Sequence, residues 1–387
     1  MSNNSKYIYL LSSNARKEYI LDALETLALP FGWVQHYRYQ LKYVDNELKQ
    51  KIPKEKENKD NKLRDYKVIV CYLYQEKKNE DSGEWLVLYP FRVGTLVEVY
   101  KTGDRDIDVV HFYFKTEEYI FYNGENFTEL LKRIFENENK QNNFYAILGN
   151  KSDKLNIASK QNSKSAFHKI CESLKEEHFK SWDETKEYYP LFCFIEGLKG
   201  DKPRKWRIGI PNPFIRQSEI FKPQYDKLSC KSYYKISEAT SYSLEFEVYF
   251  PKQPPEFSIK IKSDEKVFAP PICEFKIASR YDEENCVLMT RLLERNTYSF
   301  ISFDTECKDL NGKETLNLSI KFPVKIVRKL FYRIVEVVGD AGFAMGTGSI
   351  ALSKILGEKW GWWYLPVIVG YALWIICKLT IKLLWRG

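Results

Sequence analysis

The sequence predicts α+β and all-β soluble domains with mostly antiparallel sheets, followed by a C-terminal two-helix transmembrane hairpin. Three observations lead to this architecture. Segments in which apolar and polar residues alternate with a period of two fill much of residues 1–322. A stretch rich in Asn, Lys and Ser separates these segments into two groups. Residues 323–387 contain two segments that are long enough to cross a bilayer.

The first group of segments predicts an α+β domain over residues 1–137. It opens with a strand and a helix, continues with strands rich in β-branched and aromatic residues, and closes with a short helix. In chain order these segments are KYIYLL, NARKEYILDALETLAL, WVQHYRYQLKYV, DYKVIVCYLYQE, EWLVLYPFRVGTLVEVY, VVHFYFKTEEYIFY and ENFTELLKRIFENEN.

Residues 138–163 are predicted to form a polar linker, and residues 164–322 a β-sandwich-like domain. After one helical segment, this second domain contains short and regularly spaced strands, which are typical of a sandwich or a jelly roll. The last strand continues directly into the first membrane segment, so little flexible chain would absorb a movement of the sandwich. The segments are AFHKICESLKEEHFKSW, YPLFCFIEGL, KWRIGI, YSLEFEVYF, EFSIKIKS, ICEFKIAS, NCVLMTRLLE, YSFISFDT and TLNLSIKF.

The second C-terminal segment, residues 362–384, predicts a transmembrane helix. An apolar run extends from Trp362 to Cys377, and Pro366 falls in the first turn, where its missing N–H costs little. The alternative is a buried helix of a soluble domain, but aromatic and basic residues at both ends favour anchoring at two membrane interfaces. These anchors are Trp360, Trp362, Trp363, Tyr364, Lys378, Lys382 and Trp385.

The first C-terminal segment, residues 335–355, has membrane length but carries polar groups. Placed on a helical wheel, it separates into a small-residue face, a polar stripe and an apolar face. We expect the small face to pack helix on helix in an oligomer and the polar stripe to line a wet cavity. An amphipathic helix at the interface and a soluble docked helix are the alternatives. The small face is Gly339, Gly342, Gly346, Ser349 and Ser353, and the polar stripe is Glu336, Asp340, Thr347 and Lys354.

Charge predicts the orientation of the hairpin. From residue 321 onward there are ten Lys or Arg and three Asp or Glu, which is a net of +7, against +8 for the whole chain. The basic residues flank the two segments, so both ends of the hairpin are expected on the cytoplasmic side of the inner membrane. The first residues lack a signal-peptide pattern, so the β-rich domains are also expected in the cytoplasm. Because the soluble part is almost neutral, DNA is not expected as a partner.

The sequence predicts no catalytic or metal site. It contains no nucleotide-binding, hydrolase, metalloprotease or kinase motif, and only four histidines. The eight cysteines show no CxxC spacing, so they are expected to be reduced thiols and not zinc ligands. We therefore expect no enzyme activity and no cofactor. A membrane-attached enzyme would require ionisable side chains gathered in a pocket, which spacing alone does not show.

Two stretches are candidates for binding a small anionic ligand. In DKPRKWRIGI, basic residues surround a tryptophan and offer charge with a stacking surface. In WVQHYRYQLKYV, one face of the strand carries basic residues. The alternative for each is a solvated strand face above a core face. The candidate ligand residues are Arg204, Lys205, Trp206, Arg207, His36 and Arg38.

The small and polar stripes of residues 335–355, together with the terminal helix, resemble prokaryotic antiviral-defence membrane effectors. In that class a cytoplasmic sensing module controls a membrane-disrupting hairpin. The resemblance implies a resting homo-oligomer that a nucleotide signal or a regulatory protein partner releases, followed by depolarisation. We therefore expect a gated pore or a permeabilising effector. The alternative is a membrane-tethered binding or scaffold protein whose hairpin is only an anchor.

Overall fold

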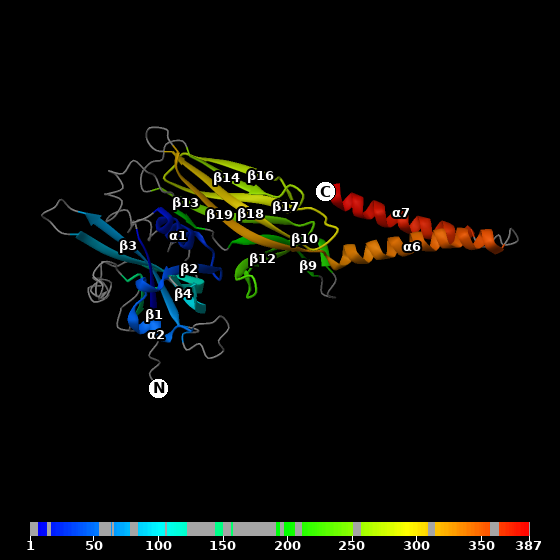
Figure 1. Cartoon of the computed structure of the whole chain (residues 1–387). Helices are drawn as coiled ribbons and strands as arrows, with labels where there is room; N and C mark the ends of the chain where they lie inside the picture. Colours follow the sequence, from blue (N-terminus) through cyan, green and yellow to red (C-terminus); the bar gives the residue numbers. More distant parts are fainter. Residues whose placement is uncertain are drawn as a thin grey trace.

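A computed structural model of the chain gives the fold. It describes residues 7–13, 17–53, 63, 66–77, 84–104, 107–121, 144–149, 156–157, 191–193, 197–205, 211–250, 257–308, 314–356 and 364–386. The described part is mostly β, with mostly antiparallel sheets, as the alternation predicted. Figure 1 shows an N-terminal sheet, a pair of packed sheets and a helix pair that projects from the far end.

The N-terminal sheet has the order β2-β5-β4-β3-β1-β6, and β7 pairs with β5. Its pairs are antiparallel except that β1 runs parallel to β3, with α1 and β2 between them in sequence. α1 packs its apolar stripe on the sheet. The elements are β1 (Tyr7–Ser13), α1 (Lys17–Ala28), β2 (Val34–Gln40), the 3-10 helix η1 (Leu41–Tyr43), α2 (Asn46–Lys51), β3 (Lys67–Lys77), β4 (Glu84–Asp104), β5 (Ile107–Phe121), β6 (Ala146–Gly149) and β7 (Asn156–Ile157).

The predicted linker contains part of this sheet. β6 lies within residues 138–163, is buried along its whole length and pairs antiparallel with β1. The Leu148 N–H also donates to Asp45 Oδ2 (3.1 Å). The four residues of β6, AILG, are small or apolar and outweigh the polar residues around them, so this piece of the predicted linker is a strand and not a spacer. The helices predicted over residues 125–139 and 166–182 lie outside the described residues.

Two further sheets pack face to face as a sandwich. One has the order β10-β9-β13-β17-β15 with β8 on β13, and the other β11-β12-β19-β18-β14-β16. Phe246 of β13 contacts Phe303 of β18 across the core, with ring centroids 4.9 Å apart. The first sheet contains β8 (Leu191–Cys193), β9 (Leu198–Lys205), β10 (Pro211–Phe221), β13 (Ser241–Tyr249), β15 (Phe268–Ala269) and β17 (Tyr281–Thr290). The second contains β11 (Gln224–Asp226), β12 (Lys231–Ser237), β14 (Phe257–Ser263), β16 (Ile272–Ile277), β18 (Thr297–Lys308) and β19 (Glu314–Val327).

The N-terminal sheet and the sandwich share one hydrophobic core. Trp33, just before β2, lies 5.3 Å from both Tyr234 of β12 and Phe322 of β19, measured between ring centroids. The Val34 N–H donates to Ser232 Oγ (2.7 Å). The N-terminal sheet thus contacts the sandwich at β12 and β19, and β19 is the strand that leads into the helix pair.

The C-terminal helices α6 (Leu330–Leu356) and α7 (Tyr364–Arg386) form an antiparallel pair. At about 1.5 Å per residue they are about 40 and 35 Å long. Among the described residues, the segment that meets the length and hydropathy of a membrane span is Tyr332–Ala351 of α6, with a mean hydropathy of 1.2. Within the part of α7 whose side chains the structure describes, the apolar segment is Leu365–Leu379. The membrane span predicted over residues 362–384 extends beyond these described side chains at both ends and stays a prediction.

Candidate functional site

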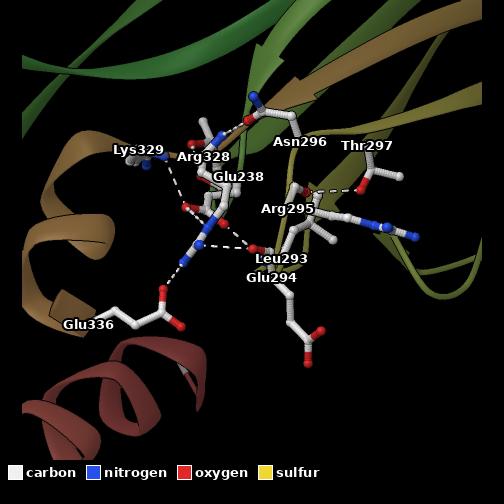
Figure 2. Close-up of polar contacts among 10 residues, drawn as sticks. Glu238, Leu293, Glu294, Arg295, Asn296, Thr297, Arg328, Lys329 and Glu336 are labelled. Carbon is white, nitrogen blue, oxygen red and sulfur yellow. Dashed lines mark hydrogen bonds and ion pairs between the residues drawn. The ribbon is translucent and has the colours of Figure 1, made fainter. Parts of the chain in front are cut away.

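The joint between the sandwich and the helix pair is two residues long. β19 ends at Val327 and α6 begins at Leu330, so only Arg328 and Lys329 connect them. The backbone N–H of each donates to a side chain from another loop of the sandwich (Figure 2). A rotation of β19 therefore reaches α6 through two fixed residues and not through a flexible linker.

Glu238 is the centre of this joint. It follows β12 and is fully buried. The Leu293 N–H donates to Glu238 Oε2 (2.9 Å), and the Lys329 N–H donates to Glu238 Oε1 (2.9 Å). The Glu238 N–H donates in turn to the Val327 carbonyl (3.1 Å). A buried carboxylate requires hydrogen bonds or an opposite charge, so this side chain fixes three loops relative to one another.

Arg328 supplies the opposite charge and extends the network to α6. Its Nε lies 3.9 Å from Glu238 Oε1, and one terminal NH2 group donates to Glu336 Oε2 (2.6 Å). The other donates to the Glu294 carbonyl (2.8 Å), while the Arg328 N–H donates to Asn296 Oδ1 (3.0 Å). A planar guanidinium with five donors suits this branching role. Arg328 thus connects a buried group of the sandwich to the second turn of α6.

The turn that carries Glu238 is fixed from both sides. Thr290 Oγ1 donates to the Ser237 carbonyl (2.8 Å), and the Thr240 N–H donates to Thr290 Oγ1 (3.1 Å). Ala239 has a φ of 46°, in the left-handed region that costs a non-glycine residue free energy. Lys329 Nζ donates to the Ala239 carbonyl (3.0 Å) and helps to hold this conformation.

The predicted small-residue face packs against α7 of the same chain. Gly339, Gly342, Gly346 and Ser349 are buried. A Cβ built on Gly342 would lie 2.9 Å from the Gly370 carbonyl oxygen, and one on Gly370 would collide with the Gly342 carbonyl oxygen. The face that was expected to meet a neighbouring copy is therefore occupied within the chain. The Ser353 and Lys354 side chains lie outside the described part of α6.

The polar stripe does not gather at one place. Glu336 is bonded to Arg328, Asp340 is exposed, and Thr347 Oγ1 donates to the Phe343 carbonyl of its own helix (3.0 Å). Because Gly339 lies opposite Cys377, Asp340 and Lys378 sit at about the same level along the hairpin. The pore-lining role of the stripe stays a prediction.

The remaining surface of the helix pair is apolar. Val337 is 67% exposed, Ile368 66% and Ile376 60%. Exposed apolar side chains occur along both helices, and a soluble protein rarely exposes so continuous an apolar surface. The others are Leu330, Ile334, Val338, Phe343, Met345, Ile350, Leu365, Val369, Ile375 and Leu379.

Of the predicted interface anchors, Lys378 is described in full and is exposed. The helix α7 includes three more whose side chains lie outside the described part, and three precede the described start of this helix. The first three are Tyr364, Lys382 and Trp385, and the others are Trp360, Trp362 and Trp363.

The candidate ligand residue His36 is part of an aromatic cluster on the N-terminal sheet. Its ring stacks on Tyr113 (4.4 Å) and on His111 (5.2 Å), with His36 Nε2 3.0 Å from His111 Nδ1. Tyr100 of β4, the other strand next to β5, stacks on His111 (5.1 Å). Burial, His111 and Arg38 lower the pKa of His36 to about 4. The sequence missed His111, Tyr113 and Tyr100 as neighbours of His36, because strand register brings them together.

The second candidate ligand stretch is not assembled into a site. Arg204 is exposed near the end of β9. Lys205 ends this strand, with a side chain outside the described part, and Trp206 and Arg207 lie outside the described residues. Within the described ranges, no group of three or more His, Cys, Asp or Glu side chains is placed to hold a metal ion.

The His36 cluster predicts a stability change in mild acid. The folded-state pKa of His36 is about 4, below the ordinary 6.5. Between these two pH values the unfolded chain therefore binds a proton at His36 that the folded chain does not bind. The cluster's contribution is present above pH 6.5 and is lost as the pH falls from about 6.5 towards 4. His36→Phe, which keeps a stacking ring, is expected to show a smaller fall in Tm between pH 7.5 and 5 than the wild type. Equal falls in both proteins would contradict the assignment.

No protein-family model matches the sequence, and a search of curated proteins gives no significant match. Among the described residues, the features that bear on function are the joint, the packed helix pair and its apolar surface.

Proposed function

We propose that this chain is a membrane effector whose α6–α7 hairpin enters the inner membrane, with assembled copies permeabilising it under the control of the cytoplasmic β-rich domains. The observation that carries the proposal is the apolar outer surface of the helix pair. The small residues that allow close packing face inward, between the helices, and large apolar side chains face outward. Lipid is the environment that favours small residues between the helices and large apolar side chains on the outer surface.

The orientation follows from the antiparallel packing. The start of α6 and the end of α7 lie at the same end of the hairpin, next to the sandwich (Figure 1). This end carries the basic residues of both flanks, which favours a cytoplasmic location. The residues are Arg328, Lys329 and Arg333 before and within α6, and Lys378, Lys382 and Arg386 in α7.

Asp340 and Lys378 lie at about the same level along the hairpin, and their charges limit how deeply the hairpin inserts into the bilayer. Beyond this level, residues 341–353 of α6 are uncharged and about 20 Å long, shorter than the roughly 30 Å hydrocarbon core. We therefore place Asp340 near the cytoplasmic interface and not at the middle of the bilayer. An inserted hairpin of this length thins the bilayer or draws water and headgroups inward, and either effect weakens the barrier to ions.

Control is assigned to the joint. Arg328 connects the buried Glu238 to Glu336 of α6, so a partner or ligand that shifts the sandwich loops also shifts the hairpin. We place the protein in antiviral defence on its resemblance to membrane effectors with a cytoplasmic sensor, and a nucleotide signal or a protein partner is the expected trigger.

Membrane potential in bacteria tests this function. The full chain is expected to depolarise the cells, and a chimera in which residues 330–386 are replaced by an unrelated two-helix anchor is not. Both proteins must be present in the membrane fraction at equal amounts. Equal potentials in the two strains would leave the tethered scaffold as the function.

A further inference from the structure

We infer that the sandwich binds a second copy of this chain head to tail, through the outer faces of its two sheets. The inference deepens the proposed function and depends on it only for the consequence of assembly. The small-residue face of α6 is filled by α7, so assembly needs another surface.

The first surface is the outer side of the β11-β12-β19-β18-β14-β16 sheet, which we name the basic face. Tyr298 and Phe300 of β18 are 68% and 46% exposed there. Lys325 Nζ lies 4.9 Å from the Tyr298 ring centroid, and Lys321 Nζ lies 5.7 Å from that of Phe300. Further outward lysines on this sheet are Lys231, Lys235, Lys260, Lys262 and Lys276. Among the side chains that the structure describes, the outward carboxylates are Asp226, Glu274 and Asp304, and Asp304 pairs with Lys262 (3.0 Å).

The second surface is the outer side of the β10-β9-β13-β17-β15 sheet, which we name the acidic face. Strand alternation directs Glu245 and Glu247 of β13 and Glu283 of β17 to this side. Glu247 is fully buried, so of these three carboxylates the exposed part of the acidic face includes Glu245 and Glu283. Asp201 of β9 lies on the same face, and Lys199 neutralises part of it by pairing with Glu245 (2.8 Å). The exposed apolar residues on this side are Ile220, Val287 and Met289.

The two faces complement each other in charge and in apolar content. Each combines charged side chains of one predominant sign with large exposed apolar ones, the composition of a patch that binds a protein of opposite charge. Because they are opposite sides of one sandwich, a copy bound through its acidic face still presents its basic face. The contact is heterologous and propagates into a ring or a stack, not a closed dimer.

The spacing between neighbouring copies in such a stack matches the width of the helix pair. Sheets pack about 10 Å apart, so each two-layer sandwich advances the stack by about 20 Å. A pair of helices, each about 10 Å in diameter, has the same width. Since every hairpin projects from the same end of its sandwich, neighbouring hairpins would lie side by side in the membrane (Figure 1).

Complementary charge reversal tests the contact in the full chain in detergent micelles. Lys321→Glu with Lys325→Glu makes the part of the basic face around Tyr298 and Phe300 acidic, and Glu245→Lys with Glu283→Lys makes the acidic face basic. Each double variant alone is expected to assemble about tenfold more weakly than the wild type by mass photometry. An equimolar mixture of the two is expected to recover assembly, because each then offers faces that the other binds. Lys266→Glu, in an exposed turn, is the control and is expected to assemble normally.

Recovery in the mixture shows that both variants fold and that the two faces meet. Unchanged assembly of both variants, or weak assembly that the mixture does not recover, would overturn the inference. The inference would also be overturned if the Lys321→Glu/Lys325→Glu variant assembled normally but bound vesicles containing anionic lipid more weakly than the wild type. That result would assign the basic face to lipid headgroups. Depolarisation by the wild type is measured separately, so assembly through these faces without depolarisation refutes the proposed function alone.

Discussion

Gly370→Leu is expected to separate α6 from α7. A Cβ at this position would collide with the Gly342 carbonyl and lie 2.8 Å from the Gly346 backbone nitrogen. Backbone atoms cannot move aside as a side-chain end can, so the helices must move apart. Overpacking of this kind costs about 1–3 kcal/mol. We expect the variant to insert into membranes but to lose its close helix contact and its depolarising activity.

A disulfide reports the contact directly. A Cβ on Gly339 would lie 3.1 Å from the Cys377 Cβ, so Gly339→Cys is expected to form a disulfide with Cys377 under mild oxidation. Adding Gly370→Leu should slow this reaction by about tenfold for each 1.4 kcal/mol of lost packing. Gly348→Leu is the matched control, since a Cβ there meets nothing within 4 Å. Equal rates for Gly370→Leu and Gly348→Leu would contradict the packing.

Glu238→Gln is expected to loosen the joint. The Leu293 and Lys329 N–H groups each donate to one carboxylate oxygen of Glu238. The carbonyl oxygen of a glutamine can accept one of these hydrogen bonds, but its NH2 group would face the other N–H donor. The substitution also leaves Arg328 without its buried anionic partner. An unsatisfied buried group of this kind costs about 1–3 kcal/mol. We expect the control of the hairpin by the sandwich to be lost while the hairpin itself still inserts.

Amide hydrogen exchange measures this loosening. The Leu293 and Lys329 amides should exchange faster in Glu238→Gln, because they lose a carboxylate acceptor. Glu294→Gln is the control: its carbonyl accepts from Arg328, but its carboxylate points away and is exposed (Figure 2). Faster exchange in both variants, or in neither, would mean that Glu238 does not hold the joint.

Much of the sheet structure was predictable because alternation is a local property. Strands are present where alternation predicted them, for example in KYIYLL, VVHFYFKTEEYIFY and YSLEFEVYF. The small-residue face of α6 was also predicted as a helix-packing surface. β10, β11 and β12 were missed, since PNPFIRQSEIF and KSYYKIS lack a strong apolar alternation or are short. Their burial comes from partners distant in sequence, such as β19 for β12.

The joint could not be predicted for the same reason. Glu238 follows a short strand in a polar turn, and nothing local marks it as buried. Its partners lie 55 and 91 residues away and are backbone N–H groups, which have no sequence signature. Gly370 did leave a local sign. A lone glycine inside an apolar helix costs about 1 kcal/mol, so it suggests a close helix contact. Only the structure pairs it with Gly342.

The most direct measurement of the central claim is the current across a planar lipid bilayer that contains the purified full chain. The account predicts conductance that the wild type and Gly348→Leu share and that Gly370→Leu lacks, at equal amounts of inserted protein. No current from inserted wild-type protein, or equal current from Gly370→Leu, would contradict permeabilisation by the packed hairpin.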